Sequence, residues 1–257
     1  MRLLFIRHAE PDYEHDSLTE KGVAEAEALA AFAGRLDLGT CYVSPLGRAA
    51  KTASYTLAAL GKTAETLDWL QEFPARIDVE RHPEVLPAFP GSHLPDGTWR
   101  RHIVWDIMPA YYAAHPELAD PVLWRTSDIA AKSNMLHVYN YVMEQFDALL
   151  AEHGYVREEG FYRVVRETSE TLTFFCHFGI SAVLLSRLMN ISPFVPLHKL
   201  CMLPSSVTEV VTEEREPGTA SFRALRIGDL SHLMIAGQEP SFAARFRETG
   251  SDTAHRA

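Results

Sequence analysis

Arg2-Leu3-Leu4-Phe5-Ile6-Arg7-His8 stands at the beginning of the chain and indicates its fold class. A continuous run of four apolar residues is typical of a strand buried on both faces, which in an α/β protein is a central strand of a parallel sheet. The pair Arg7-His8 follows where this strand ends. Because ligands bind beyond the carboxyl ends of the strands in open α/β sheets, this pair is the first candidate for a functional site.

Strand and helix patterns alternate along the rest of the chain. This alternation predicts one α/β domain with a mainly parallel sheet. The expected strands are 41–43, 67–70 and 171–176, with 206–213 and 220–227 forming a hairpin around Glu216-Pro217-Gly218. The expected helices are one that Ser17-Leu18-Thr19-Glu20 opens with capping-box spacing and that ends at Gly34, and then 48–60, 136–150 and 179–189.

Residues 74–135 interrupt this regular pattern. Eight prolines fall between Pro74 and Pro121, with histidines and arginines among them, so we expect an irregular insertion that contains short helices. Two interpretations are open: a lid over the edge of the sheet, which contacts the substrate, or a surface elaboration without function. We assign residues 1–237 to a single domain and residues 238–257 to a mobile tail.

The charge balance excludes one class of function. The chain has 24 Lys and Arg against 34 Asp and Glu, a formal net charge of −10. A nucleic-acid-binding protein needs a basic surface, so we expect no nucleic-acid partner. A small anionic substrate stays possible, because a local cluster of arginines inverts the electrostatic field inside a cleft.

The remaining composition predicts a cytoplasmic protein without a membrane partner. Only four apolar residues separate Arg2 from Arg7, which is too short for a signal peptide. The longest uncharged stretch, 171–186, falls short of the roughly 20 apolar residues of a membrane span. The three cysteines (Cys41, Cys176 and Cys201) form no CxxC pair. We expect them to be reduced and buried, without a disulfide framework or a zinc site.

The charged and titratable groups at the strand ends favour phosphoryl chemistry. Arg7 and Arg48 are permanent cations whose forked donors match phosphate oxygens, and a helix that begins near Gly179 adds backbone N–H donors. A histidine among cations stays neutral, so His8 can attack phosphorus. The departing alkoxide then needs a proton, for which Glu72, just past the 67–70 strand, is a candidate donor.

Four segments together resemble the histidine phosphatase superfamily, the phosphoglycerate-mutase-like clan. Arg7-His8-Ala9-Glu10-Pro11 resembles its RHG signature. Leu18-Thr19-Glu20-Lys21-Gly22 is similar to its LTxxG segment, and residues 44–53, SPLGRAAKTA, match its SPxxRAxxTA segment. Cys176-His177-Phe178-Gly179 stands where the second catalytic histidine is expected. Each motif alone is weak, but their order and spacing make the joint match specific.

This resemblance implies a three-layer sandwich and a set of site residues. His8 would be the phosphorylated nucleophile, and Arg7, Arg48 and His177 would bind the phosphate, with His177 also counted as catalytic. Glu72 would be the general acid. No metal and no cofactor are implied, and the partner would be a small phosphorylated substrate. Glu10 and Asp12 stay open as alternative acids.

The sequence also departs from the family in ways that bear on activity. Ala9 replaces the usual glycine, and Phe178 replaces the glycine that commonly follows the second histidine. The mutase-like segments are missing at Pro11-Asp12-Tyr13 and at Phe73-Pro74. We therefore expect a metal-independent phosphatase that acts through a phosphohistidine. A phosphoglycerate-type mutase and a catalytically silent phospholigand-binding protein are the alternatives. The substrate and the oligomeric state stay open.

Overall fold

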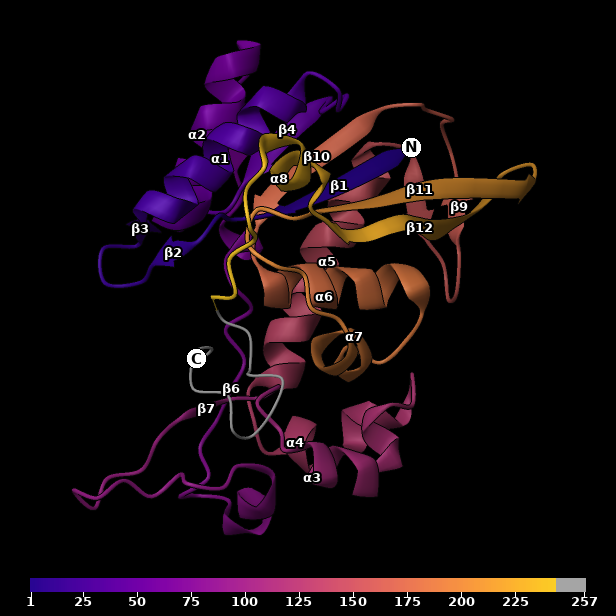
Figure 1. Ribbon diagram of the computed structural model, residues 1–257. Helices are drawn as coiled ribbons and strands as arrows, with labels where there is room; N and C mark the ends of the chain where they lie inside the picture. The colour runs from indigo at the N-terminus through magenta and orange to yellow at the C-terminus, as the bar shows by residue number, and fades with distance from the viewer. Residues whose placement is uncertain (244–257) are drawn as a thin grey trace. The chain divides into compact units, whose positions relative to one another are not determined.

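The structure is a computed structural model that describes residues 1–243 (Figure 1). The chain divides into two compact units. Unit 1 consists of residues 1–72, 150–181 and the chain from 201 onward, and unit 2 consists of residues 73–149 and 182–200. The predicted insertion, 74–135, falls within unit 2.

Within the described residues, eight strands of unit 1 form one sheet in the order β5-β4-β10-β1-β11-β12-β9-β8. β1 is fully apolar from Leu3 to Ile6 and lies in the interior of the sheet between β10 and β11, as the sequence predicts. The strands are β1 (Arg2–Arg7), β4 (Thr40–Val43), β5 (Ala64–Thr66), β8 (Tyr155–Arg157), β9 (Tyr162–Val164), β10 (Thr171–Cys176), β11 (Val207–Glu216) and β12 (Thr219–Asp229).

The sheet is mixed, so the expectation of a mainly parallel sheet is only partly confirmed. β1, β10, β4 and β5 run parallel, whereas β11, β12, β9 and β8 pair in antiparallel fashion. The reason lies in the turns. Only Pro217 and Gly218 separate β11 from β12, and a two-residue connection can only join antiparallel strands. Gly218 adopts the positive φ of 81° that such a turn favours.

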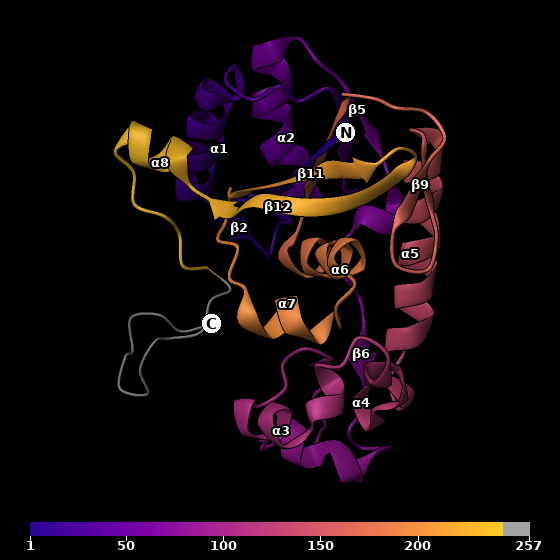
Figure 2. The same ribbon diagram turned by 90° about the vertical axis from the view of Figure 1, so that its right-hand side faces the viewer.

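Two long helices, α1 (Glu20–Ala33) and α2 (Gly47–Leu60), pack on one face of this sheet (Figure 2). The short helix α8 (Ser231–Ala236) lies against α1. The apolar core on this face joins strands and helices through the buried side chains of Leu4, Ile6, Leu29, Leu36, Leu38, Cys41, Val43, Ala53, Phe175 and Val207. The chain is therefore an α/β protein with a large mixed sheet flanked by helices.

Two predicted elements of unit 1 begin elsewhere than expected. Ser17 does not open the first helix: it lies in β3 (Ser17–Leu18), which pairs with β2 (Pro11–Asp12), and Thr19 caps α1 by accepting from the Gly22 N–H at 3.0 Å. The predicted 67–70 strand is wrong. The strand is β5, 64–66, and Asp68–Leu70 form a 3₁₀ turn, η1, that buries Trp69 and Leu70.

Unit 2 consists of short helices around buried aromatic rings. Trp124 stands at the centre, edge-on to Tyr139 at 4.9 Å and to Phe194 at 6.1 Å between ring centroids. Its elements are β6 (Arg76–Ile77) paired with β7 (His102–Ile103), η2 (Pro83–Ala88), α3 (Pro109–Ala114), η3 (Pro116–Leu118), η4 (Leu123–Thr126), α4 (Asp128–Ala131) and α7 (Phe194–Lys199), with most of α5 (Met135–Glu152) and α6 (Phe178–Met189). The predicted short helices of the insertion and the long helix after it are thus present.

One other sequence expectation needs correction. Cys41 and Cys176 are buried as predicted, but Cys201 is exposed, and all three are free thiols. The mobile tail at 238–257 stays a prediction; within it, Ser241 is fully buried and donates its N–H to Glu25 at 3.0 Å. Residues 244–257 of that tail lie outside the described residues. No helix within residues 1–243 has the length and apolar character to cross a membrane.

Candidate active site

The ends of three parallel strands bring the predicted site residues together. Arg7 at the end of β1 lies beside Cys176 at the end of β10, so His8 and His177 follow at neighbouring positions. Their imidazole rings are 5.0 Å apart between centroids. Ser44 follows β4, which is the next strand on the other side of β10, and its backbone N–H donates to the Phe175 carbonyl at 2.9 Å. The parallel half of the sheet therefore builds this edge.

The backbone and ring of His8 are held from several sides. Its N–H donates to the Cys176 carbonyl at 2.9 Å, and its carbonyl accepts from the Ser205 N–H at 3.0 Å. The ring nitrogen Nδ1 lies 2.7 Å from the Ala9 carbonyl, which can only accept, so Nδ1 carries the proton and Nε2 has a free lone pair. Burial, reinforced by the charges of Arg7 and Arg48, holds the pKa of His8 well below its usual range. A neutral imidazole with a nucleophilic Nε2 results.

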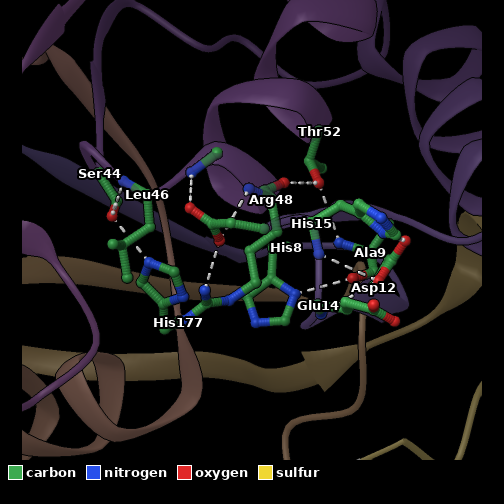
Figure 3. A network of polar contacts seen from close by, with 12 residues as sticks. His8, Ala9, Asp12, Glu14, His15, Ser44, Leu46, Arg48, Thr52 and His177 are labelled. Atoms are coloured by element: carbon green, nitrogen blue, oxygen red, sulfur yellow. Dashed lines mark hydrogen bonds and ion pairs between the residues drawn. The ribbon is translucent and has the colours of Figure 1, made fainter.

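His177 is the second neutral imidazole of the site. Its side chain is fully buried, and its Nε2 lies 2.7 Å from the Ser44 Oγ (Figure 3). Burial is the main reason that the pKa of His177 is well below its usual range, followed by its neighbours His8, Arg48 and Arg7. Two uncharged histidines beside two arginines give a site whose positive charge comes from the guanidinium groups.

Arg7 is almost completely buried at the end of β1. Its Nη1 donates to the Met202 carbonyl at 2.6 Å, and its Cζ lies 5.9 Å from the centroid of the Phe178 ring. Burial lowers the pKa of Arg7 from its ordinary value, while the nearby carboxylate of Glu72 acts in the opposite direction. Phe178 therefore supplies an aromatic neighbour to the buried guanidinium.

Arg48 lies in the first turn of α2 and is oriented by Asp16. The Asp16 carboxylate is 2.6 Å from the Arg48 Nη1 and accepts the Gly47 N–H at 2.6 Å. Gly47 must lack a side chain here, because a Cβ would lie 2.2 Å from the Asp16 carbonyl oxygen. Arg48 also lies under the exposed ring of Tyr13, whose centroid is 5.5 Å from its Cζ. The glycine inside the SPLGR segment thus lets Asp16 approach and position this arginine.

Three buried nitrogens of these residues have no hydrogen-bond partner among the described residues. They are Nε of Arg7, Nε of Arg48 and Nδ1 of His177. Buried polar groups in folded proteins are paired in the great majority of cases, so a cluster of unpaired ones indicates a position that binds something. Two of the three are N–H donors on permanent cations, which is the chemistry of an anion site.

Glu72 lies beside this cluster. Its carboxylate accepts the Ile180 N–H at 3.2 Å, in the first turn of α6, three residues beyond His177. Its negative charge also favours the charged form of Arg7 and so opposes the lowering of the Arg7 pKa by burial. Of the acids considered from the sequence, Glu72 therefore lies near Arg7 and beside the first turn of α6.

The two alternative acids are engaged elsewhere. The carboxylate of Glu10 accepts from the Thr19 hydroxyl at 2.8 Å and from the Ser241 hydroxyl. Asp12 accepts from His15, whose Nδ1 is 2.8 Å from its carboxylate. Neither pattern directs the carboxylate to the histidine pair, which favours Glu72.

Sequence reasoning assigned no role to three residues that hold the site in place. Ser44 contacts His177, and Asp16 orients Arg48. Thr52 accepts the Ala9 N–H at 3.0 Å and donates to the Arg48 carbonyl at 2.8 Å, so it ties the loop after β1 to α2 (Figure 3). Ser44 and Thr52 stand inside the quoted SPLGRAAKTA segment, which was the available signal. Ala9 fits its position because its φ is not among the positive ones of the described residues.

The described residues contain no group of three or more His, Cys, Asp or Glu side chains arranged to hold a metal ion.

Comparison with known families confirms the resemblance stated from the sequence. The model of the histidine phosphatase superfamily, branch 1, matches residues 3–101, which include Arg7, His8, Arg48 and Glu72. The chain is thus similar to this superfamily over its N-terminal part. No curated protein matches the sequence significantly.

Solved structures of phosphatases share the fold. A mutant of phosphoserine phosphatase from Entamoeba histolytica in complex with phosphoserine is 17% identical, with a TM-score of 0.55 and coverage of 90% of this chain and 98% of that one. The mycobacterial glucosyl-3-phosphoglycerate phosphatase with VO3 is 19% identical, with a TM-score of 0.52 and coverage of 88% and 97%. The alpha-ribazole phosphatase from Shigella flexneri is 17% identical, with a TM-score of 0.51 and coverage of 89% and 96%.

Proposed function

We propose that this protein is a metal-independent phosphatase that hydrolyses a small phosphomonoester through a phosphohistidine at His8. The observation that carries the proposal is the cluster of unpaired buried nitrogens on Arg7, Arg48 and His177 around a neutral His8. A phosphate group supplies acceptor oxygens for such nitrogens and a phosphorus atom for the nucleophile. The alternative of a silent phospholigand-binding protein keeps the anion site but gives no reason for a free lone pair on His8.

In the first chemical step, the lone pair of His8 Nε2 attacks phosphorus, a P–N bond forms and the P–O bond to the leaving group breaks. The electron pair of that bond stays on the leaving oxygen. The guanidinium groups of Arg7 and Arg48 stabilise the negative charge on the transferring phosphoryl oxygens, which is the main protein contribution in phosphoryl transfer. The Ala9 carbonyl stabilises the proton on Nδ1 as the ring becomes positively charged.

Glu72 is the proposed proton donor. Its protonated carboxyl gives a proton to the leaving oxygen, and the resulting carboxylate then removes a proton from the water that attacks the phosphohistidine. Water attack breaks the P–N bond, releases phosphate and restores neutral His8. The contact of Glu72 with the first turn of α6 and its charge near Arg7 support this assignment.

A phosphoglycerate-type mutase is the alternative within the same chemistry. The sequence lacks the mutase-like segments at 11–13 and after Glu72, and the three compared structures are described as phosphatases. We therefore favour hydrolysis. The free thiols agree with the cytoplasmic location that belongs to this proposal.

The test is to trap the intermediate. Brief reaction with a ³²P-labelled phosphomonoester, followed by denaturation without acid, should leave a label on the protein that is labile to acid and stable to base. Label on a serine or an aspartate would contradict the proposal. Phosphoserine, a glucosyl-phosphoglycerate and 3-phosphoglycerate form the first substrate panel, because two of the compared structures are named for substrates of this kind.

Two further arms of the assay separate the alternatives. Activity should survive exhaustive dialysis against EDTA, and a loss that a divalent ion restores would show that a metal is required. With 3-phosphoglycerate, free phosphate should appear faster than 2-phosphoglycerate, with or without a 2,3-bisphosphoglycerate primer. Isomer formation at ten times the rate of phosphate release would instead identify a mutase.

A further inference from the structure

Ser44 contacts the second histidine in a way that fixes where the histidine carries its proton. Ser44 is fully buried at the end of β4, and its Oγ lies 2.7 Å from the Nε2 of His177, also fully buried. The contact is held by the sheet, because the Ser44 N–H donates to the carbonyl of Phe175, two residues before His177 on β10. Figure 3 shows the two side chains facing each other across the strand ends.

The direction of this hydrogen bond follows from the other partner of the hydroxyl. The Leu46 N–H donates to the Ser44 Oγ at 3.2 Å, so one lone pair of the oxygen is used. The hydroxyl proton itself needs an acceptor, and among the described residues Nε2 of His177 is the acceptor within reach. The Leu46 N–H therefore donates to the Ser44 Oγ, and the Ser44 hydroxyl donates to Nε2 of His177.

An accepting Nε2 leaves the proton of a neutral imidazole on Nδ1. His177 is neutral because burial and the neighbouring positive charges disfavour its imidazolium form. Nδ1 of His177 is buried and has no hydrogen-bond partner among the described residues. In this tautomer it is an N–H donor, whereas in the other tautomer it would present a lone pair and repel a phosphate oxygen.

We propose that Ser44 is a positioning residue that holds His177 in the Nδ1–H tautomer, so that His177 presents a hydrogen-bond donor to a phosphate oxygen. The part that concerns phosphate rests on the proposed function, whereas the tautomer itself does not. The two histidines then carry their protons on the same ring atom for opposite purposes. His8 uses its Nδ1 proton to bind the Ala9 carbonyl and leaves Nε2 to attack, while His177 uses its Nε2 to accept from Ser44 and leaves Nδ1–H to donate.

The tautomer is measurable without substrate. Histidine side chains labelled with ¹⁵N report by NMR which ring nitrogen bears the proton, and a His177→Gln variant assigns the signals. At neutral pH, His177 should show a protonated Nδ1 and an unprotonated Nε2. A protonated Nε2 in the wild-type protein would overturn the proposal. Because the tautomer is read in the wild-type protein, this arm does not depend on the Ser44 variants below.

Substitution of Ser44 supplies the second readout. In Ser44→Ala, the His177 signals should shift toward the Nε2–H tautomer, and Ser44→Thr, which restores a hydroxyl, should move them back. Unchanged signals in Ser44→Ala would overturn the proposal. Ser186→Ala is the matched control: it removes another buried serine hydroxyl, which donates to the Val183 carbonyl at 2.7 Å, and should leave the His177 tautomer unchanged.

Binding of inorganic phosphate connects the tautomer to function. We expect Ser44→Ala to weaken phosphate binding about tenfold and to cause no further loss when His177 is already replaced by Gln, because both changes remove the same donor. Additive losses would overturn the claim that Ser44 acts through His177. An Nδ1–H tautomer in a protein that neither binds phosphate nor releases it from the substrate panel would confirm the Ser44–His177 assignment and contradict the proposed function instead.

Discussion

Every residue of the candidate active site lies in unit 1, whereas unit 2 contributes a cluster of buried aromatic rings. In unit 1, the ends of β1, β4 and β10 bring Arg7, His8, Ser44 and His177 to one edge of a sheet, where all four are buried. In unit 2, Trp124 and its neighbours bury apolar area. No residue of the proposed chemistry lies in unit 2, so variants of each unit should affect different measurements.

The largest effect is expected at the nucleophile. His8→Asn should lower kcat/KM by about 10⁴-fold or more, because the loss of an attacking group leaves only binding and electrostatic contributions. Asparagine keeps a polar side chain beside the Ala9 carbonyl, so the melting temperature should change little. Steady-state assays with the best substrate of the panel, alongside thermal unfolding, measure both quantities. Retention of more than a tenth of the activity would move the covalent step away from His8.

The proton donor should show a smaller effect that depends on the substrate. Glu72→Gln should slow hydrolysis of alkyl phosphates by about 10²- to 10⁴-fold, the usual range for general acid–base catalysis. An aryl phosphate with an activated leaving group needs little protonation and should lose less in the phosphorylation step. Rapid-quench measurement of that step for both substrates makes the comparison. Equal and small losses would assign the acid role to another residue.

Unit 2 should respond in the opposite way. Trp124→Ala removes a fully buried ring and should lower the free energy of unfolding by about 3–5 kcal/mol, the usual cost of such a truncation. The kcat of the folded fraction should stay the same, because no residue of the proposed chemistry belongs to this unit. Urea unfolding gives the free energy of unfolding. Active-site titration with the labelled substrate counts the active sites, so that kcat can be expressed per site. A fall in kcat per labelled site would show that unit 2 takes part in catalysis.

The difference between the sheet of unit 1 and the packed rings of unit 2 also explains which parts of the structure could be predicted from the sequence. The central strands β1 and β10 were predictable because a strand buried on both faces leaves an uninterrupted apolar run. His8 and His177 were found because they stand at the ends of these strands. The apolar run 67–70 misled the prediction, because Trp69 and Leu70 are buried by a 3₁₀ turn and not by a strand. The edge hairpin of β8 and β9 was missed because its strands have only three residues each.

The supporting residues of the site were not predictable from local patterns. Ser44 meets His177 across 133 positions of sequence, and Asp16 reaches Arg48 across 32. The sequence within a few residues of Ser44 or of Asp16 does not indicate which distant residue each one contacts. Unit 2 was described only as an irregular insertion for a similar reason: its order comes from ring packing between distant residues, such as Trp124 and Phe194, and hydrophobic periodicity does not report such contacts.

The smallest expected effect compares the acid stability of the two units through one buried histidine of each. Burial lowers the pKa of His232 in unit 1 and of His198 in unit 2 to about 4, against an ordinary value of 6.5. Between these two values the unfolded chain binds a proton that the native state does not, so stability falls as the pH falls below 6.5. Each histidine should cost about 1.4 kcal/mol per pH unit over this range.

Two substitutions each replace one of these titratable imidazoles by a side chain that does not titrate and that keeps a native contact. His232→Gln retains an amide near the Ser205 hydroxyl, which lies 2.9 Å from the native Nε2, and His198→Phe retains the stacking on Tyr112. Urea unfolding at pH 7 and pH 5 should show a gentler decline of stability for each variant than for the wild type. If the units unfold together, both variants should flatten the same transition. If they unfold separately, each should flatten only the transition of its own unit, and an unchanged decline in both variants would show that neither histidine is buried in the neutral form.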